Sequence, residues 1–138
     1  MLKETLKKYY SQEKDLNCAE TILYAANDEY GLDIDKAGFK TMAAFGGGMG
    51  VEGVCGAITG ALAVLGIMFV KDRAHESTKI KELSKKFIED FKEELGTDNC
   101  RELKEKYRND EKRCWRMIET AGEVLEGIIE SEKNECRD

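Results

Sequence analysis

The chain has 138 residues, of which 36% are charged and 41% hydrophobic, and its formal net charge is −6. This length and balance fit a single globular domain spanning residues 1–138 and exclude a disordered chain. The acidic net charge, with no basic stripe interleaved with aromatic residues along the sequence, argues against nucleic acid as a partner.

The composition also favours helices and a reducing compartment. The sequence contains no proline, the residue that most often breaks helices. Residues 1–6 are charged and amphipathic and lack the apolar stretch of a signal peptide, so we expect a cytoplasmic protein. Under reducing conditions, the five cysteines are better explained by metal binding or redox chemistry than by a disulfide framework.

Two helices are predicted in the first thirty residues. Apolar residues at helical spacing over residues 2–10 indicate a short first helix. Asn17 and Glu20 have the spacing of a capping box, which predicts that a second helix begins there and carries Cys18 in its first turn. Gly31 is placed to end this helix in a left-handed conformation.

A third helix and a glycine-rich loop are expected next. Asp33 or Asp35 can cap the helix, which we expect to continue to Gly46. The loop over residues 46–53 contains a formal G-x-G-x-x-G pattern. We reject a dinucleotide site, because a helix rather than a strand is predicted before the loop and Glu52 places a negative charge where a phosphate would bind. The glycines are better explained by backbone geometry that shapes the approach to Cys55.

Residues 54–70 form an uncharged run that we predict to be a buried central helix. The run is shorter than the roughly 20 residues needed to cross a bilayer, so membrane insertion is not expected. Gly56 and Gly60 would give the helix a flat side against which another backbone can pack. The predicted fold is therefore all-α, a compact multi-helix bundle around a glycine-rich central helix. The same flat side could pair with a second copy, so a homodimer is compatible with the sequence.

Three further helices are predicted in the second half. Residues 77–95 alternate apolar and charged positions at helical spacing. A cap at residues 97–98 would begin a short helix with Cys100 in its first turn, and residues 109–110 would begin the last helix. Cys114 would then lie on the inward face of that last helix.

The cysteines are the residues most able to carry chemistry. Cys18, Cys55 and Cys100 are each predicted in the first turn of a helix, where free N–H groups and the helix dipole favour a thiolate. Because Cys114 is predicted to face the same interior, we expect these four thiols to converge. Any one of them could instead be an ordinary buried core residue. No C-x-x-C pair is present, so spacing alone gives little support for a metal site.

The remaining candidate residues receive no functional role. His75 is the only histidine, which largely excludes histidine-rich metal sites. Trp115 is expected in the core. Cys136 belongs to a polar tail over residues 135–138 that we expect to fray.

Cys18, the segment 53–60 (GVCGAITG), Cys100 and Cys114 together resemble the C_GCAxxG_C_C family, whose members are described as redox-active. The resemblance implies that these four cysteines are the functional residues and that Cys136 is not. Related sequence occurs in split-Soret cytochromes, which bind haem and an iron–sulfur centre. This chain lacks a C-x-x-C-H haem attachment motif, so only the iron–sulfur part of that resemblance can apply.

Three hypotheses follow. In the first, Cys18, Cys55, Cys100 and Cys114 bind an iron–sulfur cluster of the [2Fe–2S] type and exchange electrons with a redox partner protein. In the second, no metal is bound and Cys55 is the reactive thiol of a thiol–disulfide protein. In the third, the same cysteines bind zinc in a helical interaction module. The sequence identifies neither the partner nor a substrate.

Overall fold

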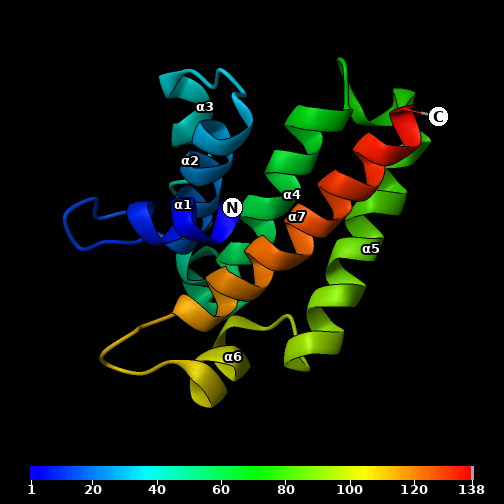
Figure 1. Ribbon diagram of the computed structural model, residues 1–138. Coiled ribbons are helices and arrows are strands. Elements are labelled where there is room, and N and C mark those ends of the chain that lie inside the picture. Colours follow the sequence, from blue (N-terminus) through cyan, green and yellow to red (C-terminus); the bar gives the residue numbers. More distant parts are fainter. Residues whose placement is uncertain (138) are drawn as a thin grey trace.

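The computed structural model describes the backbone of residues 1–137 and the side chains of residues 1–134. Within this range the chain is helical and contains no strand, so the all-α prediction is confirmed (Figure 1). None of the described helices is both long and apolar enough to cross a membrane. The seven α-helices are α1 (Leu2–Tyr9), α2 (Cys18–Tyr30), α3 (Lys36–Lys40), α4 (Gly56–Phe69), α5 (Thr78–Leu95), α6 (Cys100–Tyr107) and α7 (Trp115–Arg137).

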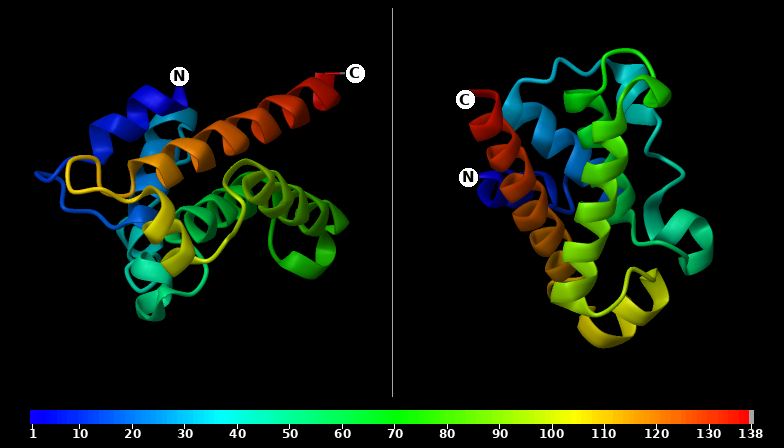
Figure 2. Two further views of the ribbon diagram at one scale, coloured as in Figure 1. Left: turned by 90° about the horizontal axis from the view of Figure 1, so that it is seen from below. Right: turned by 90° about the vertical axis from the view of Figure 1, so that its right-hand side faces the viewer.

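Helix α4 is the predicted central helix, and α2, α5 and α7 pack around it (Figures 1 and 2). Half of its residues, including Gly56 and Gly60, are buried. A Cβ atom at Gly60 would lie 2.7 Å from the carbonyl oxygen of Ala19 in α2. The predicted close approach therefore occurs within the chain, between α2 and α4. The helix is not covered on every side, because Ile67 near its end is 44% exposed.

The predicted capping box at the start of α2 is present. The Asn17 side chain accepts a hydrogen bond from the Glu20 N–H at 2.7 Å, and Glu20 accepts one from the Asn17 N–H at 2.9 Å. The Asn17 amide also donates to the carbonyl oxygens of Met42 and Ala43, both at 3.2 Å. One side chain thus fixes the start of α2 and the segment that leads into the glycine-rich loop.

Replacing Asn17 with alanine should destabilise the protein by about 1–2 kcal/mol, since the cap at the N-terminus of α2 is lost. Chemical denaturation would measure this change from the transition midpoint at constant slope. Asn99→Ala is a matched comparison, because Asn99 caps the much shorter α6 through the Glu102 N–H. An Asn17→Ala loss no larger than experimental error would contradict the assigned role of this side chain.

Two predicted boundaries are wrong. Helix α3 ends at Lys40 rather than Gly46, because the next residues form tight turns in which N–H groups bond three residues back. The last helix begins at Trp115 rather than near residue 109. Asn109 and Arg113 exchange two backbone hydrogen bonds, and Arg113 has a φ of 52°, so this segment is a turn that cannot belong to a right-handed helix.

The end of the chain was predicted to fray. Helix α7 extends to Arg137. The Cys136 side chain lies outside the described residues, and its lack of a role stays a prediction.

Candidate functional site

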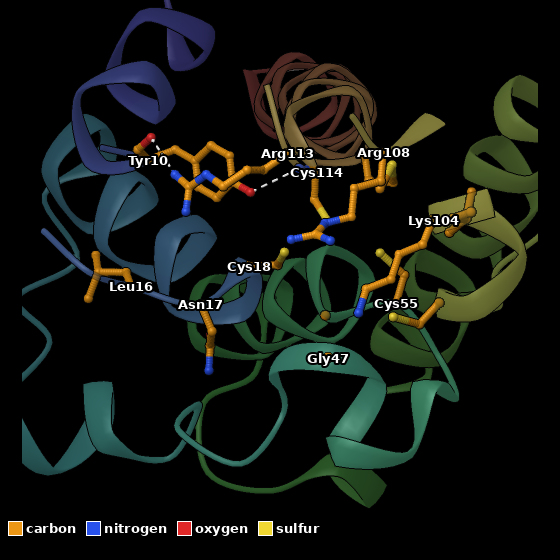
Figure 3. Close-up of a pocket in the computed structure, with 14 residues that line it drawn as sticks. Tyr10, Leu16, Asn17, Cys18, Gly47, Cys55, Lys104, Arg108, Arg113 and Cys114 are labelled. Carbon is orange, nitrogen blue, oxygen red and sulfur yellow. Dashed lines mark hydrogen bonds between the residues drawn. The ribbon is translucent and has the colours of Figure 1, made fainter. Parts of the chain in front are cut away.

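Four cysteines from four segments line one cavity of about 180 Å³. Cys18 is the first residue of α2 and Cys100 the first of α6, whereas Cys55 and Cys114 directly precede α4 and α7. Each predicted site residue therefore lies at a helix N-terminus, and the expectation that Cys114 would lie within the last helix is wrong. Figure 3 shows the labelled cysteine side chains directed toward a shared space.

Cys55 and Cys100 form one half of the site, and their backbones are tied together. The Cys55 N–H donates to the Asp98 carbonyl oxygen at 2.8 Å, and the Cys100 N–H donates to the Gly53 carbonyl oxygen at 2.5 Å. The two hydrogen bonds cross between the segments that lead into α4 and α6. They fix the two cysteines next to each other without any bound group.

Cys18 and Cys114 form the other half. The Cys18 thiol hydrogen-bonds Cys114, which lowers the pKa of Cys114 and raises that of Cys18. The Tyr10 hydroxyl accepts a hydrogen bond from the Cys114 N–H at 3.0 Å and fixes the backbone at this point (Figure 3). Burial, followed by the neighbouring thiols, raises the Tyr10 pKa to about 12, so the hydroxyl stays neutral at physiological pH.

Three cationic side chains line the cavity, those of Lys104, Arg108 and Arg113. Arg108 reaches toward Cys18 and Cys114 in Figure 3. After the Cys18 hydrogen bond, the positive charges of Arg108 and Lys104 are the main causes that lower the Cys114 pKa, to about 6, against the opposing effect of burial. Lys104 also lies 3.6 Å from Glu52. The site therefore combines the Cys114 thiol, whose pKa is lowered, with nearby positive charge.

The pKa values of the other thiols are raised, whereas the sequence predicted that helix N-termini would lower them. Burial raises the Cys55 pKa to about 11, although the Ala57 and Ile58 N–H groups at the start of α4 oppose the shift. Burial also raises the Cys100 pKa. The predicted lowering by helix N-termini is therefore wrong for the free thiols, since desolvation exceeds the dipole effect. Of the four, the structure favours Cys114 rather than Cys55 as the thiolate of the metal-free protein.

In metal-free protein, Cys114 should be alkylated by iodoacetamide faster than Cys55 at neutral pH. Its rate should fall as the pH drops through about 6, because protonation removes the nucleophilic thiolate. Peptide mapping by mass spectrometry would give the rate at each cysteine. In Arg108→Gln the same fall should occur at higher pH, since a cation that favours the thiolate is missing. Faster labelling of Cys55 would instead support the sequence-based assignment.

The glycine-rich loop shapes one side of the site. Residues 48–52 form an irregular turn closed by a hydrogen bond from the Gly53 N–H to the Gly48 carbonyl oxygen, and Met49 and Glu52 have φ values of 63° and 53°. Gly48 has a φ of 60°, and a Cβ atom there would lie 2.8 Å from the Cys100 Cβ. The loop follows turns rather than a strand, which agrees with the rejection of a dinucleotide site. Its glycines permit the close approach to Cys100.

Sequence reasoning did not assign roles to the polar residues of the site. Tyr10, Lys104, Arg108 and Arg113 all line the cavity. No periodic pattern in the sequence distinguishes these residues. Lys104, Arg108 and Arg113 belong to charged stretches that predict a solvent-exposed surface. His75, given no role, lies in a short exposed turn away from the cavity lining.

A family model described as "Putative redox-active protein (C_GCAxxG_C_C)" matches residues 16–128. The chain belongs to the C_GCAxxG_C_C family. The match contains all four cysteines of the cavity and excludes Cys136, so the predicted resemblance is confirmed. Searches of curated proteins and of solved structures found no match.

A single metal ion and a centre with two metals place different demands on the four cysteines of this C_GCAxxG_C_C site. Among the described residues, no group of three or more His, Cys, Asp or Glu side chains is placed around a position for one ion. A structural zinc requires four ligands around a single ion. The thiols occur instead as two neighbouring pairs around a larger cavity.

Proposed function

We propose that the four cysteines of the cavity bind a [2Fe–2S] cluster and that the protein transfers single electrons. The observation that carries this proposal is the convergence of Cys18, Cys55, Cys100 and Cys114 from four helix N-termini on one cavity. A volume of about 10–15 Å³ is enough for one water molecule. The cavity of about 180 Å³ therefore has room for a group much larger than one ion.

The pairing of the thiols supports a centre with two metals. A [2Fe–2S] cluster takes four cysteine ligands, two on each iron. Two backbone hydrogen bonds, to Asp98 and Gly53, hold the segments of Cys55 and Cys100 together, whereas Cys18 and Cys114 interact through their side chains. Each pair is suited to one iron. The zinc hypothesis, which needs all ligands around a single ion, receives less support from this arrangement.

The charges of the site also suit a cluster. Four thiolates bring more negative charge than the iron–sulfide core neutralises, so the surrounding protein must supply compensation. The helix N-termini at each cysteine and the cations of Lys104 and Arg108 supply it. When bound, the cluster supplies reversible one-electron chemistry, and its potential depends on such neighbouring charges.

The direct test is purification without air, followed by a visible spectrum and quantification of iron, acid-labile sulfide and zinc. We expect brown protein with about two iron and two sulfide per chain, and bleaching on reduction with dithionite. Protein that contains no iron and stays colourless after anaerobic reconstitution would contradict the proposal. Zinc at one equivalent would favour the interaction-module hypothesis instead.

A second candidate function is thiol–disulfide exchange by the Cys18–Cys114 pair. The hydrogen bond between the thiols and the lowered pKa of Cys114 support it. The Cys114 thiolate would attack a substrate disulfide and release one substrate thiolate, which takes up a proton. Cys18, after losing its proton, would attack the Cys114 sulfur and release the second substrate thiolate. The substrate gains two electrons, and the protein is left with a Cys18–Cys114 disulfide.

This candidate is tested on metal-free protein treated with oxidised glutathione. Differential alkylation and mass spectrometry should then find a Cys18–Cys114 disulfide that dithiothreitol reverses. If all four thiols stay reduced in the folded protein, the exchange function is excluded.

A further inference from the structure

A basic cavity lies beside the cysteine site and shares Arg113 with it. It has a volume of about 480 Å³. Six cationic side chains and one carboxylate line it, in a protein whose net charge is −6. We call it the basic basin; its charged residues are Lys3, Lys7, Lys106, Lys112, Arg113, Arg116 and Glu119.

The sequence did not reveal the basin because its cations come from separate segments. Lys3 and Lys7 belong to α1, Lys106 to α6, Lys112 and Arg113 to the turn, and Arg116 to α7. These elements meet around the start of α7, the orange end of that helix in Figure 1. The sequence has no basic stripe, but the fold brings these separate cations together on one surface.

Most of the positive charge in the basin is not neutralised. Lys3 lies 2.9 Å from Glu119, the single carboxylate of the lining. Four other cations of the basin are Lys7, Lys106, Lys112 and Arg116. Among the described residues, no carboxylate lies within ion-pair distance of any of these four. Three of these four lie instead over aromatic rings, Lys7 over Trp115 and Lys106 and Arg116 over Tyr107. The side chains of all four are exposed.

The basin is continuous with the cysteine site. Arg113 lines both cavities, and its guanidinium lies 4.4 Å from the Tyr10 ring centre. Trp115 lines the basin, directly follows Cys114 and stacks on Tyr10. A macromolecule seated on the basin would therefore lie next to the Cys18–Cys114 half of the site.

We propose that the basic basin is the docking surface for an electron-transfer protein with a carboxylate-rich surface; this rests on the proposed redox function. Complementary charge steers association and sets orientation. The acidic remainder of the protein would repel such a carrier, so the basin directs it to the face that borders the cysteines. A small polyanion or an RNA would use the same charges, and the test separates these occupants.

The binding test uses an acidic flavodoxin as the probe and the fluorescence of Trp115, the only tryptophan, as the signal. This readout does not require a cluster. We expect saturable binding that weakens with salt and falls at least about tenfold in the double variant Lys7→Glu/Lys112→Glu, in keeping with the size of electrostatic steering. The control Lys81→Glu/Lys85→Glu makes the same charge change on the exposed face of α5 and should bind nearly as wild type.

Equal weakening in both double variants would show a general charge effect and overturn the assignment. Failure to bind flavodoxin, with saturable binding of inorganic triphosphate or of a single-stranded RNA, would also overturn it in favour of those ligands. A basic cytochrome c should bind no better to wild type than to Lys7→Glu/Lys112→Glu, and the opposite result would contradict the proposed polarity.

A second measurement separates this proposal from the proposed function. Reduced flavodoxin is mixed with anaerobically reconstituted protein, and the rate of electron transfer is followed by stopped flow. We expect the basin variant to be slower by at least about tenfold at low salt, with unchanged iron content. If the basin variant keeps both its iron content and the wild-type rate of electron transfer, the proposed docking surface is overturned and the proposed function is not. Absence of iron overturns the proposed function, whereas the fluorescence titration still tests the surface.

Discussion

Anaerobically isolated Cys55→Ser protein is expected to lack the visible absorbance of the wild type, whereas Cys136→Ser should keep it. Cys55 is 4% exposed and lines the cysteine cavity. Losing a ligand's hydrogen-bond partner already costs about 10–100-fold in metal affinity. Losing the ligand itself should therefore weaken iron binding by at least about tenfold. Iron and sulfide quantification, together with the spectrum, would measure this.

Cys136 is the control because it lies outside the four-cysteine pattern and outside the matched residues 16–128. Circular dichroism would establish that both variants remain folded. Equal iron content in the two variants would overturn the assignment of Cys55 as a ligand. The same comparison applied to Cys18→Ser, Cys100→Ser and Cys114→Ser would test each remaining ligand.

Replacing Gly60 with valine should destabilise the protein by about 3 kcal/mol, at the upper end of the cost of overpacking a core. A Cβ atom at Gly60 would lie 2.7 Å from the Ala19 carbonyl oxygen and 2.9 Å from the Ala19 Cα. Both are backbone atoms of α2, so relief requires the two helices to separate. Urea denaturation would measure the loss as a lower transition midpoint.

Gly66→Val is the matched control on the same helix. Apart from its chain neighbours and the nearby backbone of its own helix, no atom lies within 4 Å of a Cβ built at Gly66. Valine and glycine differ by only a few tenths of a kcal/mol in helix propensity, so this variant should stay within about 0.5 kcal/mol of wild type. Similar stabilities of the Gly60 and Gly66 variants would contradict the close packing of α2 against α4.

The features that sequence predicted well depend on local chemistry. The Asn17–Glu20 capping box, the Gly31 terminus of α2 and the amphipathic pattern of α5 each involve residues within one or two turns. The central position of α4 followed from its lack of charge. Helix-start signals point to Cys18, Cys55 and Cys100, and the family pattern adds Cys114, although Cys114 precedes the last helix rather than lying within it.

The features that sequence missed depend on tertiary structure. The last helix starts at Trp115 because a turn closed by Asn109 and Arg113 precedes it, and the cap signal at residues 109–110 serves that turn instead. The order of the thiol pKa values follows from the Cys18–Cys114 hydrogen bond, from burial and from Arg108, none of which periodicity reveals. Trp115, predicted as core, is half-buried and packs against the core while also lining the basic basin.

The pairing of Cys18 with Cys114 has a consequence for the order of events during biosynthesis. Cys18 leaves the ribosome nearly a hundred residues before its neighbour, and Cys100 and Cys114 follow only after α5 has been made. A nascent chain therefore holds two thiols whose counterparts do not yet exist. A cofactor that needs all four thiols can therefore be completed only once Cys114 has been made, the last of the four and the residue that leads into α7, which packs against α1 and α4.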